Sequence, residues 1–236
     1  MEYSILIPLK DEEGNIDRLI DEIEQVMDPL SKSWELICVD DGSSDQTLAI
    51  LEKLATMKPY LRILVFTRNF GQSSAFDAGF KIARGEFLIT IDGDGQNDPA
   101  DIPKLIEASK DCDLVCGIRH KRMDSLVKKL TSALANGVRR WVCRDGITDS
   151  GCSLKLYRRQ CLKNIKMYHG MHRFLPALFQ AEGFRVKEIP VNHRKRIKGA
   201  SKYHFRNRSF NTISDMLAVR WMKKRSLRYT IEKEIP

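Results

Sequence analysis

Two aspartates one residue apart, Asp92 and Asp94, have the spacing that a metal-dependent reaction requires. They follow an apolar segment, 86–91, that is typical of a buried parallel strand, and Gly93 allows a sharp turn at its carboxyl end. Ionised carboxylates this close repel each other, and Mg²⁺ or Mn²⁺ would remove the repulsion, with Gln96 as a further oxygen ligand. An isolated Asp-x-Asp is also compatible with a solvated turn.

The segments around this strand predict the sheet that positions it. Strand-like runs alternate four times with helical patterns over the first half, and the runs are 3–8, 34–39, 61–66, 86–91 and 112–117. This alternation predicts an α/β fold with a doubly wound, mostly parallel sheet. Three consecutive strands end in polar loops that contain glycine, at the edge where such sheets bind ligands. Neither a dinucleotide-binding glycine motif nor a P-loop is present, which disfavours those two enzyme classes.

The second half has a different pattern. We expect a helix over 124–142, strands over 153–157 and 185–191, a short helix over 174–181 and a final helix over about 206–224. The final helix carries an apolar stripe, made up of Phe210, Ile213, Leu217 and Trp221. The stripes of the two long helices are compatible with lying on a bilayer, and equally with packing on the sheet or across a dimer interface.

Charge is divided unevenly along the 236 residues, whose net charge is +9. Residues 1–118 carry 11 Lys and Arg against 23 Asp and Glu, net −12, and residues 119–236 carry 29 against 8, net +21. The acidic half suits a metal ion, and the basic half suits an anion. Nucleic acid, an anionic membrane and a phosphorylated acceptor are therefore the candidate partners.

The cysteines and the apolar runs bear on location. None of the six cysteines forms a Cys-x-x-Cys pair, and several lie in apolar segments, so we expect reduced, buried thiols in a cytosolic setting. No apolar run approaches the roughly 18 residues of a membrane-spanning helix, and we expect no secretory signal.

Five motifs occur in an order that resembles one enzyme family. They are Ile7-Pro8-Leu9-Lys10-Asp11-Glu12-Glu13, Val39-Asp40-Asp41-Gly42-Ser43-Ser44-Asp45, Asp92-Gly93-Asp94, Gly117-Ile118-Arg119, and Arg196-x-x-Gly199-x-Ser201-Lys202. Together they resemble family 2 glycosyltransferases of the GT-A fold, in the branch of dolichol-phosphate mannosyltransferase and bacterial undecaprenyl-phosphate sugar transferases. Lys10-Asp11 departs from the Tyr-Asn that is usual in the first motif.

The resemblance implies a domain organisation and a reaction. Residues 1–204 would form a GT-A domain, with a nucleotide-sugar-binding half (1–118) and an acceptor-binding half (119–204), and 205–236 would add an amphipathic helix and a tail. The reaction would be a metal-dependent, inverting transfer of a hexose from a UDP- or GDP-sugar to a polyprenyl phosphate. The enzyme would be peripheral on the inner face of the cytoplasmic membrane.

The resemblance also implies the donor-site residues. Asp92, Asp94 and Gln96 would hold the metal, Mg²⁺ or Mn²⁺, on the donor diphosphate. The nucleotide site would be lined by Pro8, Lys10, Glu12, Asp40, Asp41 and Asp92.

The acceptor determines which further groups the reaction needs. A lipid phosphate is largely ionised at pH 7, because its second pKa lies near ~6, so it requires cations rather than a base. We expect Arg119, Arg196 and Lys202 in this role, with hydroxyl donors Ser132 and Ser201. Asp149 is the obvious acidic residue in this region, and it would either act as a base or orient an arginine.

Two other readings stay open at this point. One is transfer to a saccharide hydroxyl in cell-envelope polysaccharide or lipopolysaccharide synthesis, for which Asp149 would be essential. The other is a basic nucleic-acid-binding module, although the run 194–202 contains no recognised binding motif. The sequence identifies neither the sugar and the nucleotide nor the oligomeric state, which includes the option of a homo-oligomer.

Overall fold

The computed structural model describes the chain except residues 120–136, 196–207, 228–231 and 234–236. In the described part, seven strands form one mixed sheet in the order β3-β2-β1-β4-β6-β5-β7. The strands are β1 (Tyr3–Leu9), β2 (Trp34–Asp40), β3 (Leu61–Val65), β4 (Phe87–Thr90), β5 (Leu114–Arg119), β6 (Lys155–Arg158) and β7 (Val186–Val191). The five predicted strands of the first half are confirmed, with ends that shift by one or two residues.

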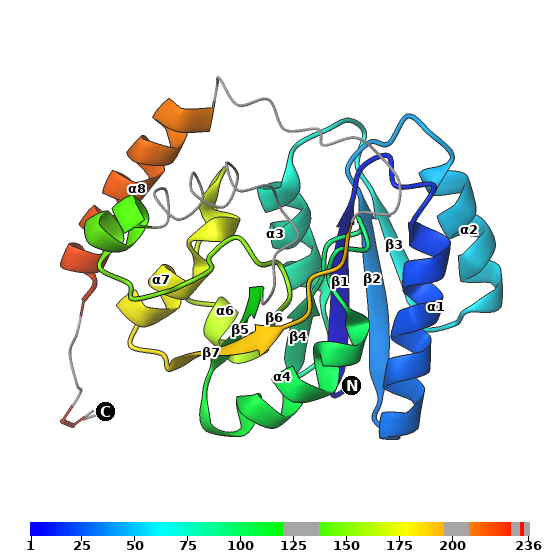
Figure 1. Cartoon of the computed structure of the whole chain (residues 1–236), viewed down its shortest axis with the longest axis horizontal. Coiled ribbons are helices and arrows are strands. Elements are labelled where there is room, and N and C mark those ends of the chain that lie inside the picture. The colour runs from blue at the N-terminus through cyan, green and yellow to red at the C-terminus, as the bar shows by residue number, and fades with distance from the viewer. Residues whose placement is uncertain (120–136, 196–207, 228–231, 234–236) are drawn as a thin grey trace.

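The first four strands run parallel, and helices connect them. α1 (Ile16–Met27), α2 (Thr47–Met57) and α3 (Gln72–Ile82) follow β1, β2 and β3 in turn. β4 pairs with the opposite side of β1 from β2, so the order of strands reverses between β1 and β4. Open α/β sheets bind ligands where the order reverses, at the carboxyl ends of the strands. Figure 1 shows the loops after β1, β2 and β3 at the upper end of the sheet.

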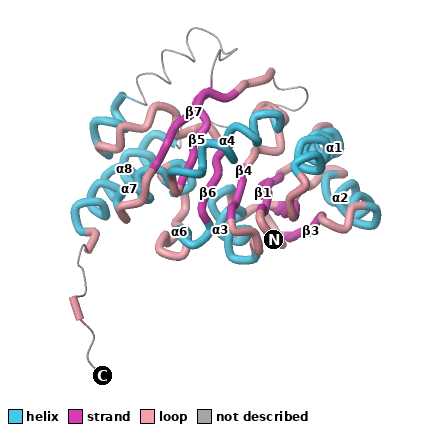
Figure 2. The backbone as a smooth tube through the Cα atoms, turned by 90° about the horizontal axis from the view of Figure 1, so that it is seen from below, coloured by secondary structure: helices cyan, strands magenta, loops and turns pink. Residues whose placement is uncertain are grey.

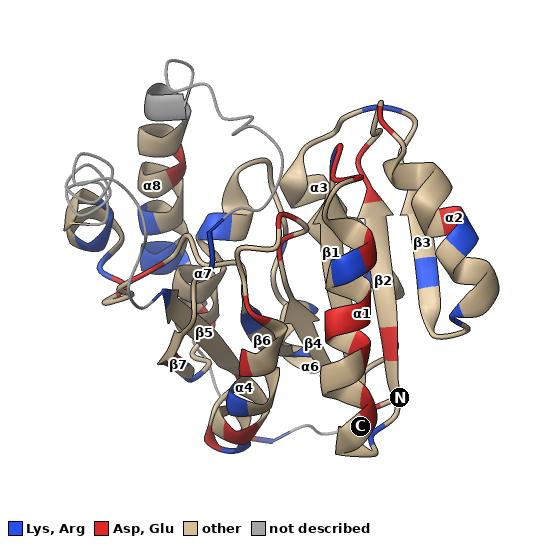
Figure 3. Ribbon diagram, turned by 45° about the vertical axis from the view of Figure 1, so that its right-hand side comes forward, with Lys and Arg blue, Asp and Glu red and all other residues tan. Residues whose placement is uncertain are grey.

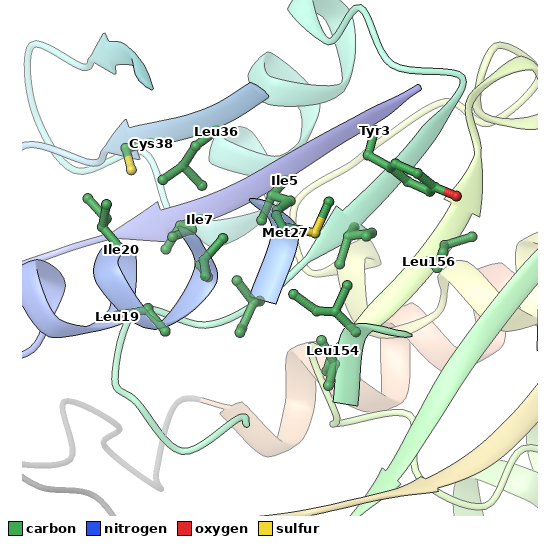
Figure 4. Packing of buried hydrophobic residues seen from close by; sticks show 14 of the residues in the cluster. Tyr3, Ile5, Ile7, Leu19, Ile20, Met27, Leu36, Cys38, Leu154 and Leu156 are labelled. Atoms are coloured by element: carbon green, nitrogen blue, oxygen red, sulfur yellow. The ribbon is translucent and has the colours of Figure 1, made fainter. Parts of the chain in front are cut away.

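Apolar side chains cover both faces of the sheet. One core joins β1, β2, β4 and β5 to α1, α2 and α4 (Ile102–Ala108), and Figure 4 shows Leu19 and Ile20 of α1 near Ile7 of β1. The other joins the opposite face to α3 and α7 (Leu175–Ala181), with Phe76 and Phe179 buried. Figure 2 shows α1 and α4 on one side of the sheet and α3 and α6 (Arg159–Leu162) on the other. The prediction of a doubly wound sheet is therefore confirmed.

The second half of the chain completes the sheet with one reversed strand. The strand expected over 153–157 is β6, which begins at Lys155 and runs antiparallel to both β4 and β5. β7, expected over 185–191, pairs in parallel with β5. Because β6 is reversed, its amino end lies beside the carboxyl ends of β4 and β5, and the loop before it reaches the ligand-binding edge.

The last helix, α8 (Arg208–Arg225), turns its apolar stripe outward. Met216 and Val219 are buried in a third core with α7 and Cys143. The predicted stripe is exposed instead: Ile213, Leu217 and Trp221 are 52%, 57% and 63% exposed. An interpretation of this stripe as core is therefore wrong, because α8 packs through the side of the helix that carries Met216 and Val219.

Some predictions fall on residues that the structure does not describe. Of the helix expected over 124–142, only 137–143 are described, and these are helical. Arg196, Ser201, Lys202 and Ser132 lie outside the described residues. The division into a donor half and an acceptor half stays a prediction.

Candidate active site

A cavity of about 530 Å³ opens at the carboxyl edge of the sheet. Six predicted residues line it, namely Pro8, Lys10, Glu12, Asp41, Asp92 and Asp94. They come from the ends of β1, β2 and β4, which the chain order places far apart. The opposite wall is formed by residues of α3 and of the loop 169–173. The parallel pairing of β2, β1 and β4 thus gathers acidic and basic groups around one cavity.

Hydrogen bonds fix the loop after β1 against the loop after β2. The ammonium of Lys10 donates to the carbonyl of Gly42, and the main-chain N–H of Ser44 donates to Asp11 at 2.6 Å. The N–H of Glu12 donates to the Thr47 hydroxyl at 2.8 Å. Lys10-Asp11, which departs from the family's usual pair, therefore makes contacts that hold the two loops together.

Asp41 holds the third loop. Its carboxylate oxygens accept hydrogen bonds from the main-chain N–H groups of Phe70 at 2.6 Å and Gly71 at 2.9 Å. Gly71 directly precedes α3, and its φ of +89° suits glycine. Asp41 is 5% exposed, and both of its oxygens accept bonds from this loop, so its observed contribution is to shape the cavity wall.

Asp40, the last residue of β2, is 1% exposed and does not line the cavity. One carboxylate oxygen accepts from the N–H of Ser43 at 3.2 Å. The other, Oδ1, is buried and has no hydrogen-bond partner among the described residues. A buried acceptor without a donor costs about 1–3 kcal/mol, which makes this oxygen a candidate acceptor for a ligand.

The Asp92–Asp94 pair carries an electrostatic cost. Burial, followed by repulsion from Asp94, raises the pKa of Asp92 to about 6, although Lys155 and Arg119 act in the opposite direction. The amide of Gln72 donates to Asp92 at 2.9 Å and holds it in place. At Gly93, a Cβ atom would lie 2.4 Å from Cδ2 of Leu9, so a larger residue between the aspartates would have to displace the Leu9 side chain.

The donor set fits a divalent cation that retains open positions. In the described chain, no group of three or more His, Cys, Asp or Glu side chains could hold a metal ion. Two carboxylates with an adjacent amide nevertheless match Mg²⁺ or Mn²⁺, because these ions accept oxygen ligands from substrate phosphates and water. Gln96 joins Asp92 and Asp94 in lining a neighbouring cavity.

This second cavity, of about 320 Å³, adjoins the first at the aspartate pair. Its walls are rich in cations and hydroxyls, including Arg119, Lys155 and Ser153. Lys155 is 3% exposed, and its ammonium donates to the carbonyls of Ser150 and Cys152. The described residues provide no carboxylate within ion-pairing distance of this ammonium. The cavity is therefore a place where an anion would be stabilised.

Arg119 and Asp149 form a two-pronged ion pair at the edge of this cavity. Nε and Nη2 of Arg119 each donate to a carboxylate oxygen of Asp149 at 2.7 Å. Burial disfavours the charged guanidinium, but Asp149 outweighs this and raises the pKa of Arg119. Asp149 is 5% exposed and lines neither cavity, whereas Arg119 lines the second. Asp149 therefore contacts Arg119 and does not itself reach either cavity.

The sequence did not single out the opposite wall. His172 and Arg173 line both cavities, next to Asp92 and Asp94. Nδ1 of His172 lies 2.6 Å from the hydroxyl of Ser73, which fixes the ring against α3. In the sequence, Arg173 is one of several cations that could meet an anion, and only the fold brings it and His172 opposite the aspartates.

A comparison with protein-family models identifies the family. The model of "Glycosyl transferase family 2" matches residues 4–174. The chain belongs to glycosyl transferase family 2. The match extends from β1 to the start of α7, and so includes all residues described above as lining the two cavities.

Curated relatives within the family act on polyprenyl phosphates according to their names. Dodecaprenyl-phosphate galacturonate synthase of Rhizobium johnstonii is 39% identical over 225 residues, which is 93% of this chain and 66% of that protein. Undecaprenyl-phosphate 4-deoxy-4-formamido-L-arabinose transferase of Edwardsiella ictaluri is 37% identical over 85% of this chain and 62% of its own. The chain therefore spans somewhat less than two thirds of these relatives' length.

Solved structures share the fold at low identity. Glucosyl-3-phosphoglycerate synthase from Mycobacterium tuberculosis, in complex with Mn²⁺, UDP and glucosyl-3-phosphoglycerate, superposes with a TM-score of 0.64 at 18% identity, over 94% of this chain and 78% of that one. TarS from S. aureus, in complex with UDP-GlcNAc, gives 0.64 at 21%, over 93% and 66%. The predicted GT-A fold is confirmed.

Proposed function

We propose that this chain transfers a hexose from a UDP- or GDP-sugar to a polyprenyl phosphate, with inversion at the anomeric carbon. The observation that carries the proposal is the junction of the two cavities, where an acidic pair suited to a cation meets a cation-rich pocket suited to an anion. Relatives at 37–39% identity carry names of polyprenyl-phosphate sugar transferases, which supports this acceptor class.

The nucleotide would occupy the first cavity. Oδ1 of Asp40 is a buried acceptor without a partner among the described residues, and a base N–H would satisfy it after a small opening of the loop. Glu12 and Lys10 line the cavity and would face the ribose and the phosphates. Asp41 would act through the loop that it holds, and Pro8 would form part of the floor.

Asp92, Asp94 and Gln96 would hold the divalent metal. Burial and then repulsion from Asp94 raise the pKa of Asp92, and a bound cation would offset both effects. A solved structural neighbour contains Mn²⁺ together with UDP, which supports a divalent ion on the donor side. When bound, the cation supplies Lewis-acid stabilisation of the departing nucleoside diphosphate.

The acceptor phosphate would enter the second cavity and meet Arg119. Because that phosphate is already ionised, no residue needs to remove a proton from it. Asp149 keeps the Arg119 fork in one orientation, and this lowers the entropy lost when a phosphate binds. We keep Arg196, Lys202, Ser132 and Ser201 as proposed acceptor contacts on the strength of the motif resemblance.

We also propose that the chain acts at the inner face of the cytoplasmic membrane. Among the described residues, no helix is long and apolar enough to cross a bilayer. All six cysteines are free, buried thiols, which suits a reducing compartment. The exposed stripe of α8 is joined by Trp141, which is 77% exposed, and the helix ends in Lys223, Lys224 and Arg225. Exposed tryptophans beside Lys and Arg suit an anionic lipid surface.

The test of the function combines labelled UDP- or GDP-sugars, undecaprenyl phosphate and Mg²⁺ or Mn²⁺ with the purified chain. We expect label to enter the organic phase only when a divalent ion is present. The Asp94→Asn variant should lose this transfer by at least 100-fold, because one of the two proposed metal carboxylates is gone. Label that appears only in a water-soluble saccharide would reject the lipid acceptor and favour transfer to a hydroxyl.

A further inference from the structure

A second basic pocket lies at the opposite edge of the sheet from the active site. This pocket, the basal hollow, has a volume of about 310 Å³ and is lined by Met1, Arg84, Glu86, Arg158, Arg159, Gln160 and Lys163. It lies where β1 and β4 begin and β6 ends, at the lower end of the sheet in Figure 1. The reaction proposed above leaves it without a role.

The basal hollow has an excess of positive charge. Four Lys or Arg side chains line it against one carboxylate, that of Glu86. Arg158 is committed to Glu86 at 3.4 Å and to Asp113 at 3.8 Å. The other three cationic residues are Arg84, Arg159 and Lys163. Their side chains make no ion pair or hydrogen bond within the described chain. Arg84 comes from the acidic half of the chain, and the other three cations come from the basic half.

The hollow is also partly preorganised. Nε of Arg159 is buried and has no acceptor in the described part of the chain. The main-chain N–H of Arg159 donates to the Glu86 carbonyl at 2.9 Å, and the Arg158 guanidinium lies over the Phe87 ring at 5.0 Å from its centroid. A buried N–H without an acceptor costs about 1–3 kcal/mol, and an oxygen atom of a ligand would recover that cost. Figure 3 shows the short α6, which begins at Arg159, beside β4 and β6.

We propose that the basal hollow binds a phosphate-bearing anion. Two arginine forks and an ammonium match the several oxygens of a phosphate or diphosphate better than they match a single carboxylate. The volume is at the lower end of the range for small-molecule sites, which suits a compact phosphorylated compound or the headgroup of a phospholipid. The inference is independent of the transfer reaction, because the two sites lie at opposite edges of the sheet.

Calorimetric titration with inorganic pyrophosphate tests this proposal. EDTA is included so that the Asp92–Asp94 site cannot recruit the ligand through a metal. The double variant Arg159→Gln, Lys163→Gln should bind pyrophosphate at least tenfold more weakly than the unmodified chain. A matched variant, Lys53→Gln, Lys187→Gln, removes the same charge from exposed positions outside the hollow and should bind like the unmodified chain.

A parallel measurement distinguishes a free phosphate compound from a lipid headgroup. Sedimentation with vesicles of phosphatidylcholine and phosphatidic acid is compared for the same two variants. Weaker pyrophosphate binding by the Arg159/Lys163 variant, with normal binding by the Lys53/Lys187 variant, supports a site for a free phosphate compound. Weaker vesicle binding with the same contrast between the variants supports a site for a lipid headgroup. Equal binding by both variants to both probes overturns the proposal, as does no binding of either probe by the unmodified chain.

Discussion

Ionising Asp92 carries a free-energy cost in the metal-free protein, which Lys155 and Arg119 offset only in part. Without metal, its folded-state pKa of about 6 exceeds the ordinary 3.8, so the folded chain binds the proton more tightly than the unfolded chain does. Its contribution to stability is therefore favourable at low pH and is lost as the pH rises from about 4 to about 6. Above pH 6 the full penalty applies, and the metal would remove it.

Replacing this carboxylate should stabilise the metal-free protein. In EDTA at pH 7.5, Asp92→Asn should raise the free energy of unfolding by about 1–2 kcal/mol, because the burial of a charged group and the repulsion with Asp94 both disappear. Thermal unfolding at pH 4 should show no difference. Added Mn²⁺ should stabilise the unmodified chain and not the variant. Asp77→Asn, an exposed carboxylate on α3, is the control, and an equal gain there would contradict the explanation.

The Asp149–Arg119 pair gives a second test at the scale of single residues. Asp149→Asn should lower kcat with the lipid phosphate by about 10–100-fold, because an amide holds the Arg119 fork poorly. The donor KM and the shape of the pH–rate profile should change little. Glu188→Gln alters a carboxylate that accepts from the Thr148 and Asp149 N–H groups without touching Arg119, and it should be milder. Loss of one limb of the pH profile in Asp149→Asn would show instead that it is a base.

At the scale of elements, the loops after β2 and β3 require glycine where they touch. Gly42 has φ +67°, and a Cβ there would lie 2.6 Å from the main-chain carbon of Arg68. Gly146 has the similar φ of +66° with no described atom within 4 Å of such a Cβ. Gly146→Ala should cost about 1 kcal/mol through backbone strain alone, and Gly42→Ala about 3 kcal/mol or more. Equal costs in urea unfolding would mean that the contact with Arg68 gives way freely.

The elements differ in how far the sequence could predict them. β1 to β5 were predictable, because their apolar runs are continuous and each is bounded by a turn signal. The reversed direction of β6 was not, because parallel and antiparallel strands of four residues have the same local pattern. The outward face of α8 was also missed, since Met216 and Leu217 are equally apolar and only the partner, α7, decides which is buried.

The residues of the candidate site also differ in how far the sequence could predict them. Asp92, Asp94 and the loops after β1 and β2 could be found because their motifs are contiguous. His172 and Arg173 could not, because they reach the cavities only when residues far apart in sequence pack together. The pairing of Asp149 with Arg119 also became visible only in the structure, because the two residues are 30 positions apart.

At the scale of the whole molecule, α8 connects an exposed apolar surface to the wall of the cleft. Its buried side, at Met216 and Val219, packs in one core with Met171 and Phe174, which flank His172 and Arg173. Its other side presents Leu217 and Trp221 to solvent. A membrane bound by that side would therefore meet the helix that supports the wall of the two cavities.

Vesicle sedimentation tests this arrangement. The double variant Leu217→Ser, Trp221→Ser should partition onto vesicles that contain phosphatidylglycerol about tenfold less than the unmodified chain, because each side chain loses apolar area that the bilayer would bury. Met57→Ser, Val65→Ser alters side chains that are 60% and 52% exposed elsewhere and should partition normally. Binding should also weaken at high salt, since Lys223, Lys224 and Arg225 follow the stripe. Equal partition of the two double variants would show that α8 faces something other than lipid.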